Sequence, residues 1–236
     1  MKILALESSA VAASAAVCED EELIAQSFQH SGLTHSRTLL PMCRDLLQNC
    51  GLSLKEMDVV AVAAGPGSFT GLRIGVAAAK GLAWAADKPC AGVSTLEAMA
   101  WSLAFLEDAD LCPVMDARRD QVYNALFTAQ GGTLERRTKD RAISLDELAE
   151  ELSARKKTQI LVGDGAKLCY NELSQRGLEV RLAPPHLRFQ SAWGVARGAV
   201  GLARAHKLVQ PAELVPAYHR LSQAERERLA RAQEKK

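Results

Sequence analysis

The glycine-rich segment at residues 65–75 has the residue types of a ligand-binding loop. It reads Gly-Pro-Gly-Ser-Phe-Thr-Gly-Leu-Arg-Ile-Gly and lies between an apolar run and an alanine-rich run. Backbone N–H groups where a helix begins can hold an anion such as a nucleotide phosphate. The Gly-Lys-Ser/Thr ending of a phosphate-binding P-loop is absent, however. The alternative is a tight turn whose glycines adopt positive φ and let the helix pack closely.

Two predicted strand ends carry charged residues that extend this candidate site. Glu7 ends the first apolar run, where a carboxylate either orients a metal–nucleotide complex or caps a turn. Residues 116–120 (Asp-Ala-Arg-Arg-Asp) follow a later run, and an ion-paired turn is favoured there over a ligand contact. The candidate nucleotide- or anion-binding residues are therefore Glu7, Ser8, Gly65, Gly67, Ser68, Thr70, Gly71 and Arg73.

The sequence lacks the patterns typical of metal or nucleophilic catalysis. His30 and His35 are five residues apart, whereas two ligands on one helical face need a spacing of three or four. The chain has no Gly-x-Ser-x-Gly nucleophile elbow and no Cys-x-x-Cys pair among its six cysteines. We predict no metal site and no catalytic residue. The cysteines are expected to be buried and reduced.

Composition restricts the partners and the location of the protein. Lys and Arg number 29 against 28 Asp and Glu, a formal net charge of +1. Proteins that bind a nucleic-acid backbone without a partner show a clear excess of basic residues. Any nucleic acid is therefore expected to be held by a partner. Glu7 interrupts the first apolar run too early for a signal peptide, and no run approaches the ~20 apolar residues of a membrane span. The expected location is the cytoplasm, with no membrane contact.

The elements that must position these residues follow from apolar periodicity. Helices are predicted at residues 36–50, 72–86, 94–106, 144–155, 166–175 and 191–206. Strands are predicted at residues 2–6, 12–17, 23–28, 59–63, 90–93, 111–115, 121–128, 159–162 and 178–182. The pattern indicates an α/β protein with two related lobes, at residues 1–108 and 109–221. A charged tail at residues 222–236 is expected to be frayed or disordered.

A series of motifs resembles the TsaB (YeaZ) family. They are Lys-Ile-Leu-Ala-Leu-Glu-Ser-Ser at residues 2–9, His-Ser-x-x-Leu-Leu-Pro at 35–41, the glycine-rich segment at 65–75, Ala-Lys-Gly-Leu at 79–82, Gly-Val-Ser-Thr-Leu at 92–96, Asp-Ala-Arg at 116–118, Val-Gly-Asp-Gly at 162–165 and Pro-x-Tyr-x-Arg at 216–220. Glu7 stands where Asp is commoner in TsaB chains. The resemblance covers residues 2–220, and Gly-Pro-Gly-Ser-Phe-Thr-Gly is highly specific.

The resemblance implies an actin-like, Hsp70-like ATPase fold of two lobes, each with a mixed sheet and flanking helices. It implies a non-catalytic scaffold in making threonylcarbamoyladenosine beside the tRNA anticodon, where the related TsaD performs the transfer. TsaD is the implied partner, TsaE docks on the pair, tRNA is contacted indirectly, and the free protein is a homodimer. TsaD-type proteins bind a metal through His-x-x-x-His, but here Ser31 stands four residues before His35. No tightly bound cofactor is implied, and ATP or ADP at the partner interface is the remaining candidate.

Two predicted helices are the candidates for the partner surface. The helix at residues 36–50 has an apolar stripe wider than one sheet contact requires, and that at 72–86 is rich in small residues. Two such helices meeting their counterparts would form a four-helix interface. The alternative is that both stripes face their own sheet. The candidate partner-binding residues are Leu39, Leu40, Cys43, Leu46, Leu47, Leu72, Gly75, Ala78, Ala79 and Leu82.

Two other functions stay open: a metal-dependent, glycoprotease-like peptidase, and a small-molecule kinase of the same fold superfamily. A peptidase needs a bound metal or an activated nucleophile. A kinase needs a phosphate-binding site in both lobes and a general base. Asp116 and Asp164 are candidates for that base, although neither has the expected glycine-rich context.

Overall fold

The short apolar strands at the N-terminus build the first of two sheets in the computed structural model, which describes residues 1–155 and 157–220. Its strands are β1 (Lys2–Glu7), β2 (Ala13–Glu19), β3 (Glu22–Gln29), β4 (Val59–Gly65) and β5 (Cys90–Ser94), in the order β3-β2-β1-β4-β5. β1, β4 and β5 are parallel, and β2 pairs antiparallel with β1 and β3. The predicted antiparallel opening of this sheet is confirmed.

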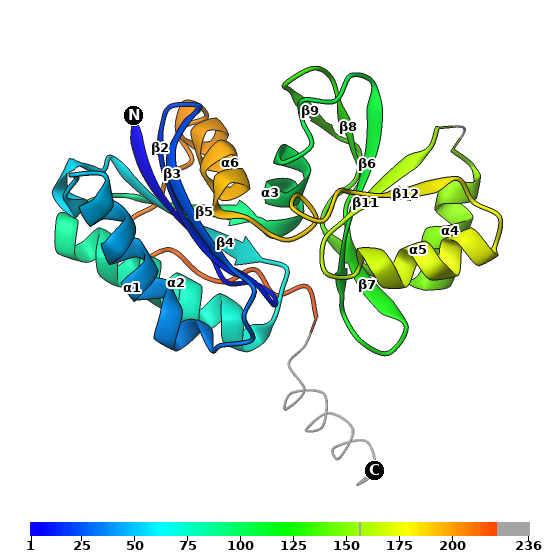
Figure 1. Cartoon of the computed structure of the whole chain (residues 1–236), viewed down its shortest axis with the longest axis horizontal. Coiled ribbons are helices and arrows are strands. Elements are labelled where there is room, and N and C mark those ends of the chain that lie inside the picture. The colour runs from blue at the N-terminus through cyan, green and yellow to red at the C-terminus, as the bar shows by residue number, and fades with distance from the viewer. Residues whose placement is uncertain (156, 221–236) are drawn as a thin grey trace, which may run out of the picture.

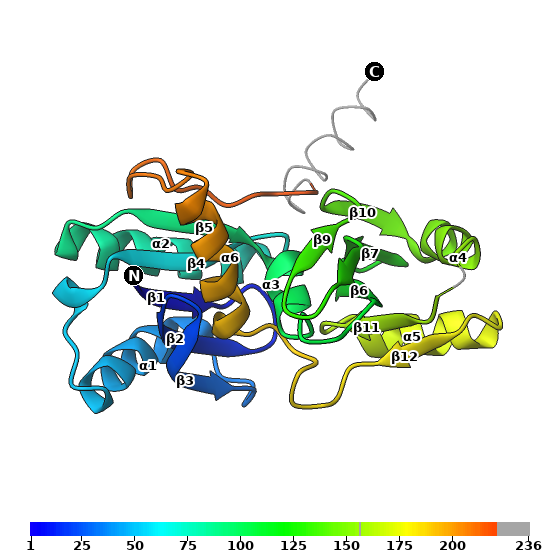
Figure 2. The same cartoon turned by 90° about the horizontal axis from the view of Figure 1, so that it is seen from above.

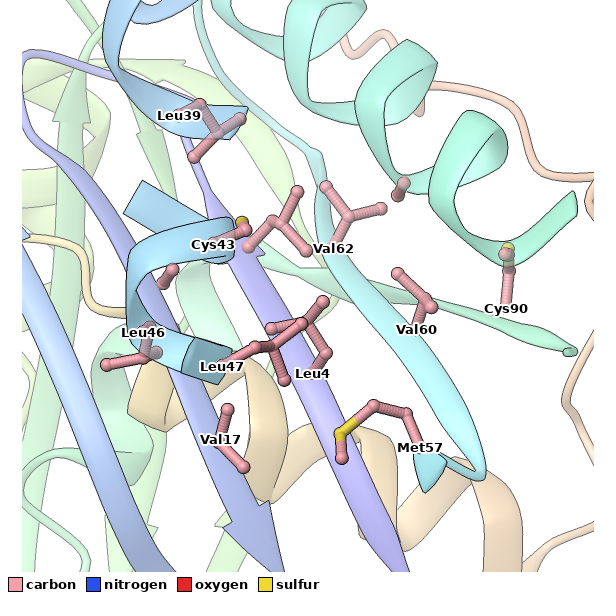
Figure 3. Packing of buried hydrophobic residues seen from close by; sticks show 14 of the residues in the cluster. Leu4, Val17, Leu39, Cys43, Leu46, Leu47, Met57, Val60, Val62 and Cys90 are labelled. Atoms are coloured by element: carbon pink, nitrogen blue, oxygen red, sulfur yellow. The ribbon is translucent and has the colours of Figure 1, made fainter. Parts of the chain in front are cut away.

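Helices cover both faces of the first sheet, because successive strand residues point to opposite faces. Three helices do this: α1 (His35–Asn49), α2 (Phe69–Ala86) and α6 (Ala192–Arg204). Leu4 of β1 packs in the cluster beneath α1 and α2, whereas the next residue, Ala5, packs in the cluster beneath α6. In the first cluster, the side chains of α1 reach down to β1 and β4 (Figure 3).

The second sheet forms a second lobe beside the first (Figure 1). Its strands are β6 (Ala109–Asp116), β7 (Gln121–Asn124), β8 (Phe127–Ala129), β9 (Leu134–Arg136), β10 (Arg141–Ser144), β11 (Gln159–Val162) and β12 (Val180–Leu182), in the order β10-β7-β6-β11-β12 with β8 paired to β6 and β9. The helices α4 (Leu145–Ser153) and α5 (Ala166–Gln175) share one core cluster with this sheet. α3 (Thr95–Trp101) contributes to a second. Among the described residues, no helix is long and apolar enough to cross a membrane.

The predicted bounds of two elements were wrong. The single strand expected at residues 121–128 is split after Asn124. Leu126 lies in the break. Its N–H donates to Thr138 Oγ1 at 2.8 Å and its carbonyl oxygen accepts the Arg137 N–H at 2.7 Å, so neither group pairs with β6. The helix expected to reach residue 106 ends at Trp101, and two carbonyl groups beyond it accept hydrogen bonds from the β8–β9 turn.

α6 comes from the range expected in the second lobe, yet it covers the first sheet. The Ala192 N–H donates to Ser14 Oγ of β2 at 2.7 Å. α6 also crosses α3 so closely that a Cβ on Gly194 would lie 1.8 Å from the Ala98 carbonyl oxygen. The lobe boundaries at residues 108 and 221 stay a prediction, and the charged tail predicted at 222–236 lies outside the described residues.

Residues 207–220, which we call the C-terminal strap, run back over the first lobe (Figure 2). Val209 forms an antiparallel bridge with Cys90 at the edge of β5. Leu214 is buried in the cluster beneath α2, and the Ala217 N–H donates to the Ala64 carbonyl oxygen at 2.7 Å. The strap therefore covers part of an edge strand that would otherwise leave backbone groups unpaired.

The six cysteines are free thiols; five are buried as predicted, whereas Cys50 is half-buried, contrary to the prediction. Burial raises the pKa of Cys90 to about 11 and that of Cys43 to about 12. Because the thiolate is the reactive form, we expect a thiol reagent at about pH 8 to label Cys50 quickly in the native protein. The other five cysteines should react only after denaturation. Mass spectrometry measures this, and Cys50→Ser should remove the fast reaction. Fast labelling of a second cysteine would contradict the buried positions.

Candidate functional site

The glycine-rich loop before α2 is filled by the chain's own β1–β2 turn. The Ser68 N–H donates to the Ser9 carbonyl oxygen at 2.7 Å, and Ser8 Oγ donates to the Gly71 carbonyl oxygen at 3.0 Å. A Cβ at Gly67 would lie 2.6 Å from the Ser9 oxygen, and one at Gly71 would lie 2.1 Å from the Ser8 oxygen. These glycines therefore make room for backbone of the same chain, which supports the close-packing interpretation of the loop.

Two further glycines of the loop serve the same kind of contact. Gly65 has a φ of +140°, and a Cβ there would meet the Ala217 carbonyl oxygen of the strap at 2.2 Å. A Cβ at Gly75 would lie 2.5 Å from Ser8 Oγ. Of the remaining candidates, Thr70 and Arg73 are exposed on the first turns of α2. Nucleotide binding by these residues stays a prediction.

Glu7 is fully buried at the end of β1, where it caps a turn. Its Oε1 accepts the Ser9 N–H at 2.5 Å, and its Oε2 has no partner among the described residues. Burial raises the pKa of Glu7 to about 7, and the negative charge of Asp164 adds to the rise. Of the two roles open for this carboxylate, the turn cap is the one with a contact to support it.

Asp164 and the β6–β7 turn supply the charged groups of the second lobe. Burial raises the pKa of Asp164, whose Oδ1 accepts Gln190 Nε2–H at 2.7 Å. Asp116 Oδ1 accepts the Arg118 backbone N–H at 2.6 Å. The expected ion pairs within this turn are wrong: among the described residues, the aspartate binds backbone rather than a guanidinium. The next residue, Arg119, is exposed.

The end of the strap joins the two lobes, a feature that sequence analysis missed. Tyr218 stacks on Phe69 of α2 with 4.4 Å between ring centroids and 12° between ring planes. Arg73 Nε donates to the Tyr218 hydroxyl at 3.0 Å. Two residues later, the Arg220 guanidinium donates to the carbonyl oxygens of Ala117 and Arg118 in the second lobe. The only signal in the sequence was the Pro-x-Tyr-x-Arg motif itself.

Most of the residues predicted to bind a partner lie inside the first lobe instead. The buried ones are Leu39, Cys43, Leu46, Leu47, Leu72, Gly75 and Ala79. Leu39, Cys43, Leu46, Leu47 and Ala79 pack in the cluster beneath α1 and α2, so their side chains are already covered within this chain. Partner binding through these residues stays a prediction. Leu40 is 47% exposed, and Ala78 and Leu82 are half-buried. Those three residues are what remains of the predicted surface.

One apolar residue that sequence analysis did not select is exposed on α2, on a different face of the helix from Leu82. Trp84 is 70% exposed and lies on the same helix as Ala78 and Leu82. A large aromatic ring left in water on a helix of small residues is typical of protein interfaces. A tryptophan within an alanine-rich run was the signal that could have found it.

The two candidate histidines serve separate structural contacts. His35 Nε2 lies 2.6 Å from the Ala10 carbonyl oxygen, so His35 holds the β1–β2 turn. The His30 ring packs against Phe189 with 4.5 Å between centroids. In the part of the chain that the structure describes, no group of three or more His, Cys, Asp or Glu side chains is arranged to hold a metal ion.

Comparisons with known proteins agree with the resemblance in the motifs. The family model for tRNA N6-adenosine threonylcarbamoyltransferase (TsaD) matches residues 13–225. The tRNA threonylcarbamoyladenosine biosynthesis protein TsaB of Bacillus subtilis is 34% identical over 168 residues, 71% of this chain and 73% of that protein. The Escherichia coli protein of the same name is 39% identical over 128 residues, 54% of this chain and 55% of that protein.

A solved structure agrees with the fold as well. YeaZ from Pseudomonas aeruginosa superposes with a TM-score of 0.78 at 27% identity, covering 92% of this chain and 99% of that chain. This likeness and the two sheets flanked by helices confirm the predicted actin-like, two-lobe fold class.

Proposed function

Since the chain belongs to the TsaB family, we propose that it is a non-catalytic scaffold in tRNA threonylcarbamoyladenosine biosynthesis. It pairs with a TsaD homologue, which transfers the threonylcarbamoyl group, and a TsaE homologue docks on the pair. The tRNA is held chiefly by the partners, and the free chain is a homodimer. The work is done in the cytoplasm, and any ATP or ADP lies at the partner interface.

One observation carries the proposal: the loop that a catalytic nucleotide would need is filled, whereas the adjacent helices keep apolar side chains exposed. The Ser68 N–H and the Ser8 hydroxyl are both used within the chain. Leu40 on α1 and Trp84 on α2 remain in water. Burying such residues against a second protein stabilises a complex by about 25 cal/mol per Å² of apolar surface removed from water.

The peptidase and kinase alternatives have no such support among the described residues. A metallopeptidase needs a group of ligands, and none is arranged there. A kinase needs a general base that can reach a substrate, but Asp164 is half-buried and hydrogen-bonded to Gln190. The other candidate, Asp116, is exposed and accepts the Arg118 backbone N–H. We therefore do not favour either activity.

The test is complex formation with the TsaD homologue of the same organism, measured by light scattering after gel filtration. We expect a one-to-one complex that Leu40→Glu and Ala78→Glu each weaken at least about tenfold, because a buried, unpaired carboxylate costs several kcal/mol. Leu39→Glu is unsuitable, since Leu39 is 1% exposed and a charge there would disrupt the fold.

Leu168→Glu on α5 is the matched control. Leu168 is 45% exposed, close to the 47% of Leu40, but it lies in the second lobe. The control should bind the partner as the unmodified chain does. Full binding by both Leu40→Glu and Ala78→Glu would place the interface elsewhere, and absence of any complex would refute the scaffold role.

A further inference from the structure

We propose that the end of the strap and the β6–β7 turn together form a surface that contacts RNA directly. The arginine–tyrosine surface, as we call it, consists of Arg73, Arg118, Arg119, Tyr218 and Arg220. Its geometry is independent of the proposed function, but the choice of tRNA as the RNA rests on that function. The surface goes beyond the scaffold role because it gives this chain its own contact with the substrate of the complex.

The β6–β7 turn presents two exposed arginines, Arg118 and Arg119. Arg118, Arg119 and Asp120 have φ values of +63°, +56° and +56°, a left-handed conformation that is uncommon outside glycine. Three such residues in succession cost conformational energy, and strain of this kind is concentrated at functional sites. The side chains of Arg118 and Arg119 are exposed, and neither pairs with another residue in the described ranges. No described side chain neutralises their charges, which suit a phosphate.

Tyr218 supplies an aromatic ring that is already held in place. One side of the ring stacks on Phe69, and its hydroxyl accepts a hydrogen bond from Arg73 Nε at 3.0 Å. Tyr218 nevertheless remains 42% exposed. Proteins that bind unpaired RNA commonly stack bases on such rings beside arginines. A fixed ring loses little conformational freedom when a base stacks on it.

Arg220 brings the ring and the turn together. It follows Tyr218 by two residues, so an extended chain separates their Cα atoms by about 7 Å. Its guanidinium donates to the carbonyl oxygens of Ala117 and Arg118, which fixes the turn against the strap. The surface thus spans both lobes, with the ring on the first and the exposed Arg118 and Arg119 on the second.

The charge of this surface fits a phosphate backbone. The four arginines of the surface outnumber the two aspartates of the β6–β7 turn, Asp116 and Asp120. Asp116 keeps its negative charge although it accepts the Arg118 N–H, so the four arginines and two aspartates leave a net charge of +2. An acidic protein would match the arginines alone, whereas RNA offers both a phosphate and a flat base for Tyr218. RNA is therefore the occupant that uses every part of the surface.

The test measures binding of an unmodified tRNA transcript to the complex with the TsaD homologue, by fluorescence anisotropy between about 50 and 200 mM salt. We expect Arg118→Glu with Arg119→Glu to weaken binding at least about tenfold and to make the salt dependence shallower by about one to two charges. Tyr218→Ala should weaken binding at least about fivefold by removing the stacked ring. Tyr218→Phe keeps the ring and should bind nearly as tightly as the unmodified chain.

Lys167→Glu with Arg181→Glu is the matched control. Both residues are exposed on α5 and β12 of the second lobe, and the pair changes net charge by the same amount. The control should bind tRNA normally. Unchanged tRNA affinity of the Arg118 and Arg119 double variant in an intact complex would overturn the RNA contact and leave the scaffold role standing. Loss of the complex itself in that variant would also overturn it, since the surface would then bind protein.

Failure of the scaffold role gives a different result. The unmodified chain would then form no complex with the TsaD homologue. Ultraviolet cross-linking of the same transcript to the full chain alone, with peptide mapping, decides the RNA contact in that case. Cross-links at Tyr218 that disappear in the double arginine variant support it, and cross-links confined to other residues overturn it.

Discussion

Gly194→Ala is expected to lower the free energy of unfolding by about 3 kcal/mol, the upper end of the usual cost of overpacking. The added methyl group would lie 1.8 Å from the Ala98 carbonyl oxygen, far inside any real contact distance. The Cβ is fixed to the backbone of α6 and the oxygen belongs to the backbone of α3, so relief requires α6 to move away from α3. That movement would also loosen the cluster beneath α6, to which Val195 and Ala199 contribute. Chemical denaturation followed by circular dichroism measures the change.

Gly201→Ala provides the control on the same helix. A Cβ at Gly201 would meet no atom within 4 Å beyond the neighbouring backbone of its own helix. Because alanine restricts the unfolded chain and favours helix, this variant should gain about 0.5–1 kcal/mol of stability. Equal changes in both variants would mean that α6 does not approach α3 as closely as the structure has it.

Glu7→Gln is expected to stabilise the protein above pH 7 by up to about 3 kcal/mol while leaving it nearly unchanged in acid. Burial raises the pKa of Glu7 from 4.5 to about 7, and each pKa unit corresponds to about 1.4 kcal/mol. The folded chain thus holds this proton more tightly than the unfolded chain does. Stability contributed by Glu7 is complete below pH 4.5 and is lost as pH rises through about 7. Glutamine is neutral throughout, so it avoids that loss.

The effect is measured from the melting temperatures of the unmodified chain and the Glu7→Gln variant. The measurements run from pH 5 to pH 9, about two units either side of the expected pKa of Glu7. The curves should separate as pH rises and run parallel above the pKa of Glu7. Glu22→Gln removes an exposed carboxylate from β3 and should leave the profile unchanged. A Glu7→Gln protein that is less stable than the unmodified chain at high pH would mean that the ionised carboxylate is required by the fold.

Local patterns were sufficient to predict the elements that surround the loop. The strand and helix on either side of residues 65–75 are present as expected, because an apolar run and an alanine-rich run have clear local preferences. The helix begins at Phe69 rather than Leu72, since the Ser68 side chain accepts the Gly71 N–H and starts it a turn earlier. The interpretation of the glycines as residues of a tight turn that allows close packing was also available from the sequence.

The direction in which a helical stripe faces was not predictable in the same way. The stripe of α1 could serve its own sheet or a partner, and only the position of β1 and β4 beneath Leu39 and Leu47 decides for the sheet. The identity of an apolar residue does not contain that information. The contact of the strap was still harder to predict from sequence. Tyr218 stacks on Phe69, about 150 residues earlier in the chain, and no periodic pattern links the two residues.

The return of α6 and the strap to the first lobe has a consequence for synthesis on the ribosome. The cluster beneath α6 combines Ile3 and Ala5 near the start of the chain with Ala192 and Val195 near its end. Proteins emerge from the N-terminus at about 5–20 residues per second, so one face of the first sheet has no cover until α6, at residues 192–204, has been made. The second lobe, whose strands and helices α4 and α5 lie between residues 109 and 182, is complete earlier. The order of folding therefore opposes the order of the sequence, and the first-made lobe is the last to close.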